Sequence, residues 1–196
     1  YARINELKEL IDKTHEFNLS VNMDVVFNHV YSYENFSWGL LVPGYVYRTD
    51  ERGFLLNSSY CGNDLRTEAR MIQKYILDVV SFYQKFYKVD GFRFDLMGLI
   101  DTKTIALVVE KTKKLNPLCM IYGEGWYMNT TLPMHENANL GSAKNLPTVS
   151  FFNDYFRNVM GGSIGGNKGF ILGDKLEESQ LNDMIINGSS LTMPFL

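Results

Sequence analysis

The chain has 196 residues, of which 45% are hydrophobic and 21% charged, and its formal net charge is −3. This composition is typical of a globular protein with a sizeable core and predicts one domain, or two at most. The weak acidic balance argues against nucleic acid or an anionic membrane as a partner, and no apolar run approaches the roughly 20 residues of a transmembrane helix.

Helix-like and strand-like segments alternate from the start of the chain. Residues 3–17 place apolar side chains at helical spacing and predict an amphipathic helix, and the β-branched run 21–27 predicts a buried strand. Residues 30–65 show no sustained period, so we expect a long loop, which is usually functional inside a compact domain. Helical spacing returns over 67–87, and a strand is predicted at 89–94.

The second half of the chain continues this alternation. A helix is predicted at 101–115, strands at 118–122 and 148–152, and a second long loop at 127–146. A further helix is expected to begin after Asn153.

The two ends of the chain give weaker signals. Residues 161–196 are rich in glycine and predict loop structure with one short helix near 176–186. The chain opens at Tyr1, without Met, inside a helical pattern, so we expect it to be a piece of a longer protein.

Alternating strands and helices imply parallel βαβ units and an α/β fold. Both a doubly wound sheet and a (β/α)8 TIM barrel fit this rhythm. Each predicted strand is followed by polar residues: Asn28 and His29, then Asp95, then Glu124, then Asn153 and Asp154. A barrel gathers its site from the ends of many strands, whereas a doubly wound sheet uses one switch point with a glycine-rich loop, which is absent here. The barrel is therefore the predicted fold.

Three of these segments suggest chemistry, although each is ambiguous alone. A histidine after a strand, such as His29, is more often a structural hydrogen-bonding residue than a functional one. In the segment 90–98, strand alternation puts Arg93 and Asp95 on one face. An arginine at this spacing keeps the carboxylate ionised and oriented, but a purely structural Arg–Asp pair explains the pattern equally well.

The third segment is centred on Glu124, which lies between Gly123 and Gly125 and is followed by Trp126. We interpret the two glycines as leaving room for a ligand close to the backbone. A glutamate beside an aromatic wall can serve as a general acid.

Together the three segments resemble the ordered sequence regions of the α-amylase superfamily (glycoside hydrolase family 13), in order, spacing and position after successive strands. In that family they end the third, fourth and fifth barrel strands. The resemblance therefore implies that residues 1–196 are the central part of a (β/α)8 catalytic domain, a fragment covering approximately strands 3 to 6. The loops 30–65 and 127–146 would follow strands 3 and 5.

The resemblance also implies residue roles. Asp95 matches the catalytic nucleophile and Glu124 the acid/base. The matched substrate-binding or support residues are Arg93, Asp24, Asn28, His29, Met97 and Trp126. No cofactor is implied. Family members often hold calcium, but no acidic loop spacing in this sequence indicates a calcium site, and no Cys/His cluster indicates another metal.

Within the superfamily the sequence is most similar to type I pullulanases, in the segments 42–48, 62–64, 94–98, 123–126 and 150–157. This similarity implies a retaining hydrolase that cleaves α-1,6 linkages in pullulan, amylopectin or glycogen, with an α-glucan polysaccharide or oligosaccharide as partner. An isoamylase, a neopullulanase or a branching-type member of the same superfamily is the alternative. A glucan-binding fragment without catalysis is another.

One expected part of the site is missing from the sequence. The superfamily supplies a third acid from a His-Asp pair, but His15, His29 and His135 are followed by Glu, Val and Glu. The later acids, including Asp154, are interpreted as surface or loop-supporting residues. A half-barrel would also leave open strand edges and an exposed apolar inner wall. We therefore expect no turnover of pullulan by this chain alone.

The two cysteines, Cys61 and Cys119, lie far apart without metal-ligand spacing and predict reduced thiols. Reduced thiols favour the cytoplasm slightly, and the localisation is otherwise unknown.

Overall fold

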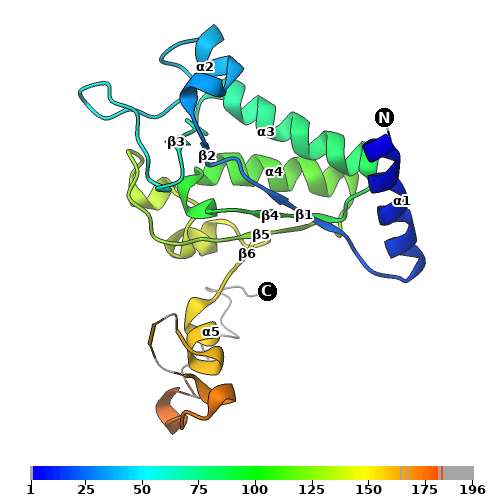
Figure 1. The fold of residues 1–196 in the computed structure, drawn as a ribbon, viewed down its shortest axis with the longest axis vertical. Coiled ribbons are helices and arrows are strands. Elements are labelled where there is room, and N and C mark those ends of the chain that lie inside the picture. The colour runs from blue at the N-terminus through cyan, green and yellow to red at the C-terminus, as the bar shows by residue number, and fades with distance from the viewer. Residues whose placement is uncertain (1, 164, 167, 181, 183–196) are drawn as a thin grey trace.

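A computed structural model describes residues 2–163, 165–166, 168–180 and 182, and its centre is a four-stranded parallel sheet (Figure 1). The strand order is β1-β4-β5-β6, with bounds β1 (Asn22–Val25), β4 (Gly91–Phe94), β5 (Met120–Gly123) and β6 (Ser150–Phe151). All three pairings are parallel, which confirms the predicted α/β fold.

Helices connect the strands and cover one face of the sheet. In Figure 1, α3 (Arg70–Phe82) and α4 (Thr102–Leu115) lie over this face, as parallel crossovers require. Helix α1 (Ala2–Glu16) precedes the sheet and α5 (Asp154–Gly161) follows it. The helix predicted for residues 67–87 is divided, because after α3 the chain continues as a π-helical turn, η2 (Tyr83–Tyr87).

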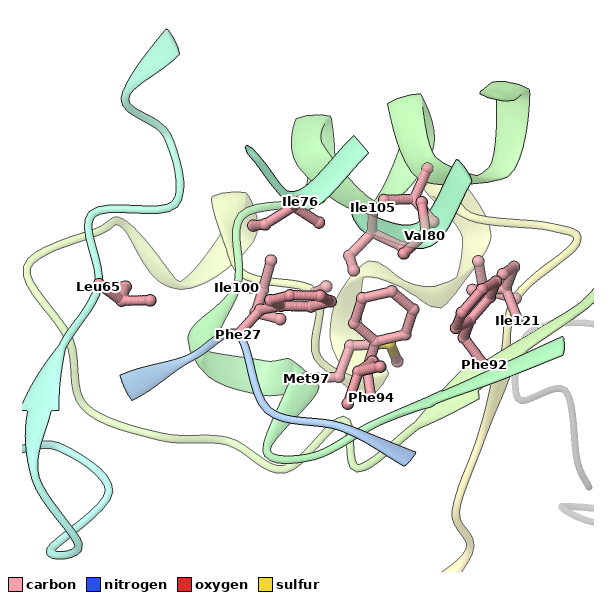
Figure 2. Packing of buried hydrophobic residues seen from close by; sticks show 14 of the residues in the cluster. Phe27, Leu65, Ile76, Val80, Phe92, Phe94, Met97, Ile100, Ile105 and Ile121 are labelled. Atoms are coloured by element: carbon pink, nitrogen blue, oxygen red, sulfur yellow. The ribbon is translucent and has the colours of Figure 1, made fainter. Parts of the chain in front are cut away.

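The core lies between the sheet and these two helices (Figure 2). Phe92 and Phe94 of β4 are both 0% exposed and point toward the helices, and Phe27 packs on Phe94 with ring centroids 6.0 Å apart. Ile76 of α3 and Ile105 of α4 are also fully buried. Full burial of each such side chain contributes roughly 1.5–3 kcal/mol, so this layer anchors β4.

The opposite face of the sheet is largely polar. Strand register aligns Asp24 with Arg93 and Arg93 with Tyr122, and alternation turns these side chains away from the phenylalanine layer. Val26 (52% exposed) and Met120 (44% exposed) are exposed apolar residues, as expected for an inner barrel wall. The row formed by Asp24, Arg93 and Tyr122, however, is not apolar. In the described part of the chain, the outer strands of this sheet each have one neighbour, which leaves the two open edges expected from the sequence.

The segment 30–65 contains more structure than its sequence indicated. His29–Val30 (β2) pairs antiparallel with Asn63–Asp64 (β3), so the loop returns to the point where it leaves the sheet. Between them lie the 3-10 turn η1 (Tyr33–Asn35) and the short helix α2 (Ser37–Leu41). The loop is thus folded back beside the carboxyl end of β1.

Beyond β5 the loop 127–146 contains two 3-10 segments, η4 (Met134–Glu136) and η5 (Leu140–Asn145), and a third, η6 (Phe170–Leu172), follows α5. Of the helix expected near 176–186, residues 178–180 and 182 are helical, while residues 181 and 183–186 lie outside the described residues. Among the helices that are described, none has the length and apolar character needed to cross a membrane. Cys61 is exposed and Cys119 buried, and both are free thiols, as predicted.

Candidate active site

The polar residues predicted to follow the strands do meet at one edge of the sheet. Hydrogen bonding between strands continues one residue past their ends: the Asp95 N–H donates to Val25 O (3.0 Å) and the Glu124 N–H donates to Phe94 O (3.1 Å). These bonds fix the backbone of both acids at the carboxyl ends of neighbouring strands.

Arg93 connects the acids. Its Nη1 bonds Asp24 Oδ1 (2.9 Å) and Oδ2 (3.0 Å) and also Asp95 Oδ1 (3.1 Å), and its Nη2 lies 2.7 Å from Glu124 Oε1. The Asp95 and Glu124 side chains are 24% and 19% exposed, whereas that of Asp24 is 63% exposed. One guanidinium therefore binds two carboxylates that are mostly shielded from water and a third at the surface.

The charge of Arg93 is stabilised by this arrangement. Burial acts to lower its pKa, but the hydrogen bond that Arg93 donates to Asp24, the charges of Glu124 and Asp24, and the hydrogen bond to Asp95 together raise the pKa above its ordinary value. The guanidinium also lies over the ring of Phe152, with its central carbon 5.5 Å from the ring centroid. Arg93 is thus a permanent cation at the centre of the site.

Asn28 holds Asp95 from the other side. Its amide nitrogen donates to the Asp95 carbonyl (2.7 Å) and to Asp95 Oδ2 (3.1 Å), and Asn28 itself is 0% exposed. His29 bonds Asn28 Oδ1 through its ring Nδ1. The structure therefore gives His29 a supporting contact with Asn28, while Asn28 contacts the predicted nucleophile directly.

Glu124 is held by the turn that follows Asp95. The Leu96 N–H donates to Glu124 Oε2 (3.0 Å), and the Gly98 N–H donates to the Glu124 carbonyl (2.9 Å). Leu96 has φ +38°, a left-handed conformation that is uncommon for a residue with a side chain. The turn continues as the 3-10 segment η3 (Met97–Leu99). The backbone directly after Asp95, whose N–H groups bind Glu124, is therefore tightly bent.

The sequence suggested that the two glycines around Glu124 leave space for a ligand, but this interpretation is wrong. A Cβ on Gly123 would lie 2.4 Å from Phe94 O, and one on Gly125 would lie 2.3 Å from Phe151 Cδ1. Both sites are filled by the protein itself. Glycine is required here because β5 approaches its neighbours too closely for any side chain.

A cleft of about 450 Å³ opens beside Glu124. It is lined by Glu124, Trp126, Phe152, Asn153, Asp154, Phe156 and Arg157. Trp126 therefore does form a wall next to the acid. Another hollow, of about 390 Å³, lies between α2 and α3, but the side chains that line it are apolar and include no acid.

Sequence reasoning gave no site role to several residues that line the cleft, including Phe156 and Arg157. Phe152, which lies beneath Arg93, received no role, and Asp154 was interpreted as a surface or loop-supporting acid although it lines the cleft. Strand alternation in 150–154 contained the signal, because it turns Phe152 to the face opposite the buried Phe151.

Met97 differs from the other predicted site residues. It is 0% exposed and lies in the core beneath Gly123, whose added Cβ would be 3.1 Å from Met97 Cβ. Met97 is therefore shielded from the cleft side, and support of the turn is the role that its position favours.

The site offers two shielded carboxylates, one fixed cation and an aromatic-walled cleft. Among the described residues, no group of three or more His, Cys, Asp or Glu side chains is arranged to hold a metal ion. Two carboxylates bound by one arginine, of which Glu124 lines the cleft, can act as nucleophile and acid/base toward a glycosidic bond.

Comparison with known proteins gives pullulanases as relatives, and an isoamylase over a shorter stretch of the chain. No family model matches the chain. A pullulanase from Bacillus subtilis (strain 168) is 44% identical over 175 residues, which are 88% of this chain and 24% of that protein. The chain thus spans about a quarter of the length of this curated relative.

Solved structures agree with this finding. The crystal structure of pullulanase type I from the same Bacillus strain, complexed with maltose, matches with a TM-score of 0.89 at 40% identity, over 95% of this chain and 26% of that chain. A pullulanase from Paenibacillus barengoltzii, in complex with maltohexaose and alpha-cyclodextrin, matches with a TM-score of 0.90 at 37% identity, over 99% of this chain and 31% of that chain.

Proposed function

Because this chain is homologous to type I pullulanases, we propose that it is the central part of a catalytic domain that cleaves α-1,6 linkages in branched α-glucans such as pullulan, amylopectin and glycogen. The observation that carries the proposal is the ion-paired set formed by Arg93, Asp95 and Glu124, which lies at the carboxyl end of a parallel sheet beside a cleft. Carboxyl ends of parallel strands are where barrel enzymes hold their catalytic groups.

The proposed domain is a (β/α)8 barrel in which β1, β4, β5 and β6 correspond to the third to sixth strands. Helices α3 and α4 cover one face of the parallel sheet, and helices outside a parallel sheet are the layering of a barrel wall. The long loops 30–65 and 127–146 then follow the third and fifth barrel strands and border the catalytic face.

The proposed reaction proceeds with retention of configuration. Glu124, in its acid form, protonates the departing glycosidic oxygen while Asp95 attacks the anomeric carbon and forms a glycosyl-enzyme. Glu124 then removes a proton from water, which attacks the anomeric carbon and releases Asp95. Arg93 and Asn28 orient the Asp95 carboxylate throughout, and Trp126 and Phe152 offer ring surfaces to the sugar.

The catalytic set is incomplete in these residues. Superfamily members use a third acid from a His-Asp pair, and the 196-residue sequence contains no such pair. We therefore predict that the purified chain gives no enzyme-like release of reducing sugar from pullulan. The rest of the catalytic domain has to supply this acid.

A hybrid enzyme tests the proposal directly. The matching segment of the Bacillus subtilis pullulanase is replaced by this chain, and hydrolysis of pullulan is measured as released reducing sugar. We expect maltotriose as the product, which indicates cleavage of α-1,6 linkages, whereas panose would indicate a neopullulanase-type specificity and contradict the assignment.

Substitutions in the hybrid test the residue roles. Asp95→Asn and Glu124→Gln should each lower kcat by about a thousandfold or more, because each removes a group that reacts in the transition state. Asp12→Asn, which makes the same chemical change on the exposed face of α1, is the matched control and should leave kcat unchanged. Near-normal turnover by Asp95→Asn would overturn the nucleophile assignment.

A further inference from the structure

Arg48 is a buried arginine outside the site described above. It lies in the loop 30–65, and its side chain is 1% exposed. Its Nη1 donates to Leu99 O (2.6 Å), while Nη2 donates to Thr67 Oγ1 and Glu68 Oε2 (both 2.9 Å). Its Nε donates to Glu68 Oε2 as well (3.2 Å). Burial of a charged group is costly unless it is paired, so this concentration of bonds at one side chain requires explanation.

One contact reaches the turn between the two catalytic carboxylates. Leu99 is the last residue of η3, the segment that begins directly after Leu96. Leu96 has the left-handed backbone and donates its N–H to Glu124. A strained backbone of this kind persists only where its surroundings hold it in place. The bond from Arg48 Nη1 to Leu99 O holds the far end of the turn.

The backbone of Arg48 reaches a second part of the site. Its N–H donates to Asp64 O (3.0 Å), and Asp64 pairs with His29 in the β2–β3 ribbon. The Leu65 N–H donates to Asn28 O (2.9 Å), and Asn28 holds Asp95. Arg48 thus joins the segment that carries Asn28 to the turn that carries the backbone donor to Glu124.

We propose that Arg48 is a positioning residue that fixes the turn 96–99 and, through it, the orientation of Glu124 relative to Asp95. The proposal rests on the function proposed above for these two acids. Arginine suits the position because its planar fork spreads five N–H donors over three nitrogens and so reaches a carbonyl, a hydroxyl and a carboxylate that lie apart, whereas lysine directs its three donors from one nitrogen. Because the side chain is only 1% exposed, we expect it to act through the turn and not by direct contact with substrate.

Hydrogen exchange on the chain itself tests the structural half of the proposal. R48M keeps the approximate length of the side chain but removes every donor, so backbone amides in 96–100 should exchange about tenfold faster or more than in the unmodified chain. R66M is the matched control, because Arg66 is half exposed, approaches Glu68 at 3.7 Å and has no contact with Leu99. It should leave the exchange in 96–100 unchanged.

Kinetics of the hybrid enzyme test the functional half. R48M should lower kcat by about a hundredfold with KM nearly unchanged, since misplacement of a catalytic group by about 1 Å has an effect of this size. R48K, which restores a charge and at least one donor, should recover part of kcat. If R48M fails to fold, R48K replaces it in both measurements. Exchange in 96–100 should then still rise and kcat should still fall, each by less than expected for R48M.

The two measurements separate failure of this proposal from failure of the proposed function. An inactive hybrid with unmodified Arg48 would contradict the function, while exchange in 96–100 would still decide whether Arg48 holds the turn. Exchange that is equal in R48M and R66M would overturn the positioning role. An active hybrid in which R48M raises KM and leaves kcat intact would also overturn it, because that result indicates substrate binding.

Discussion

Arg93 provides the most direct test of the site through stability. In Arg93→Met the side chain can still pack against Phe152, while the cation that lies over this ring and is shared by Asp24, Asp95 and Glu124 is removed. Three carboxylates would then lie close together without a countercharge. We expect the folded state to lose stability at neutral pH, where all three groups are ionised when unfolded.

The size of the loss follows from the exposure of each partner. The pair with Asp24 is 63% exposed on the acid side, so it should contribute less than about 1 kcal/mol. Asp95 and Glu124 are mostly shielded, and hydrogen bonds to charged groups of this kind contribute roughly 1.5–3 kcal/mol each before desolvation of the arginine is subtracted. A net loss of about 3 kcal/mol is therefore expected.

Urea unfolding followed by circular dichroism measures this loss. Arg93→Lys keeps the charge but not the fork, so its loss of stability should lie between those of the unmodified chain and Arg93→Met. Arg66→Met removes a half-exposed arginine with one long ion pair and should change the free energy of unfolding by less than about 0.5 kcal/mol. A free energy of unfolding for Arg93→Met within about 0.5 kcal/mol of the unmodified value would show that the ion pairs of Arg93 do not stabilise the fold.

Two further predictions concern packing and thiol reactivity. Gly125→Ala should destabilise the chain by about 1–3 kcal/mol in the same urea assay, because its Cβ would meet the Phe151 ring, whereas Gly161→Ala has open space and should be nearly neutral; equal effects would contradict the packing argument. Burial raises the pKa of the Cys119 thiol, so iodoacetamide at mildly alkaline pH should label the exposed Cys61 and spare Cys119 until urea is added. Mass spectrometry of labelled peptides measures this difference, and equal labelling of both thiols in the native chain would count against it.

Much of this fold was predictable because its signals are local. The alternation in β4 sends Phe92 and Phe94 to the helices and Arg93 and Asp95 to the site, and both directions were confirmed. The parallel arrangement followed from the order of helices and strands alone. These features depend on residues two to four positions apart, which a single sequence displays.

The parts that were missed depend on contacts between distant segments. The β2–β3 ribbon joins two-residue strands across a long loop, and strands this short have no readable period. The need for glycine at 123 and 125 likewise depends on distant residues, because an added Cβ would meet Phe94 O or the ring of Phe151. Arg48 belongs to the same class, because its partner Leu99 is far away in the sequence.

The stereochemical outcome of the proposed reaction follows from the sheet itself. Asp95 and Glu124 each come directly after residues, Phe94 and Gly123, that are partners in the β4–β5 register. Neighbouring strands lie about 4.7–4.9 Å apart, which is close to the roughly 5–5.5 Å that separates the carboxyl groups of retaining glycosidases. Inverting enzymes need about 6.5–9.5 Å, to leave space for a water molecule between the general base and the sugar. The guanidinium of Arg93 opposes any wider separation, because its Nη1 binds Asp95 while its Nη2 binds Glu124. Adjacent strands in register therefore favour attack by Asp95 itself, and the sugar released by the hybrid enzyme should first appear as the α-anomer, which proton NMR of the nascent product would detect. A β-anomer as first product would require a water between the two acids, and it would contradict the role of Asp95 as nucleophile.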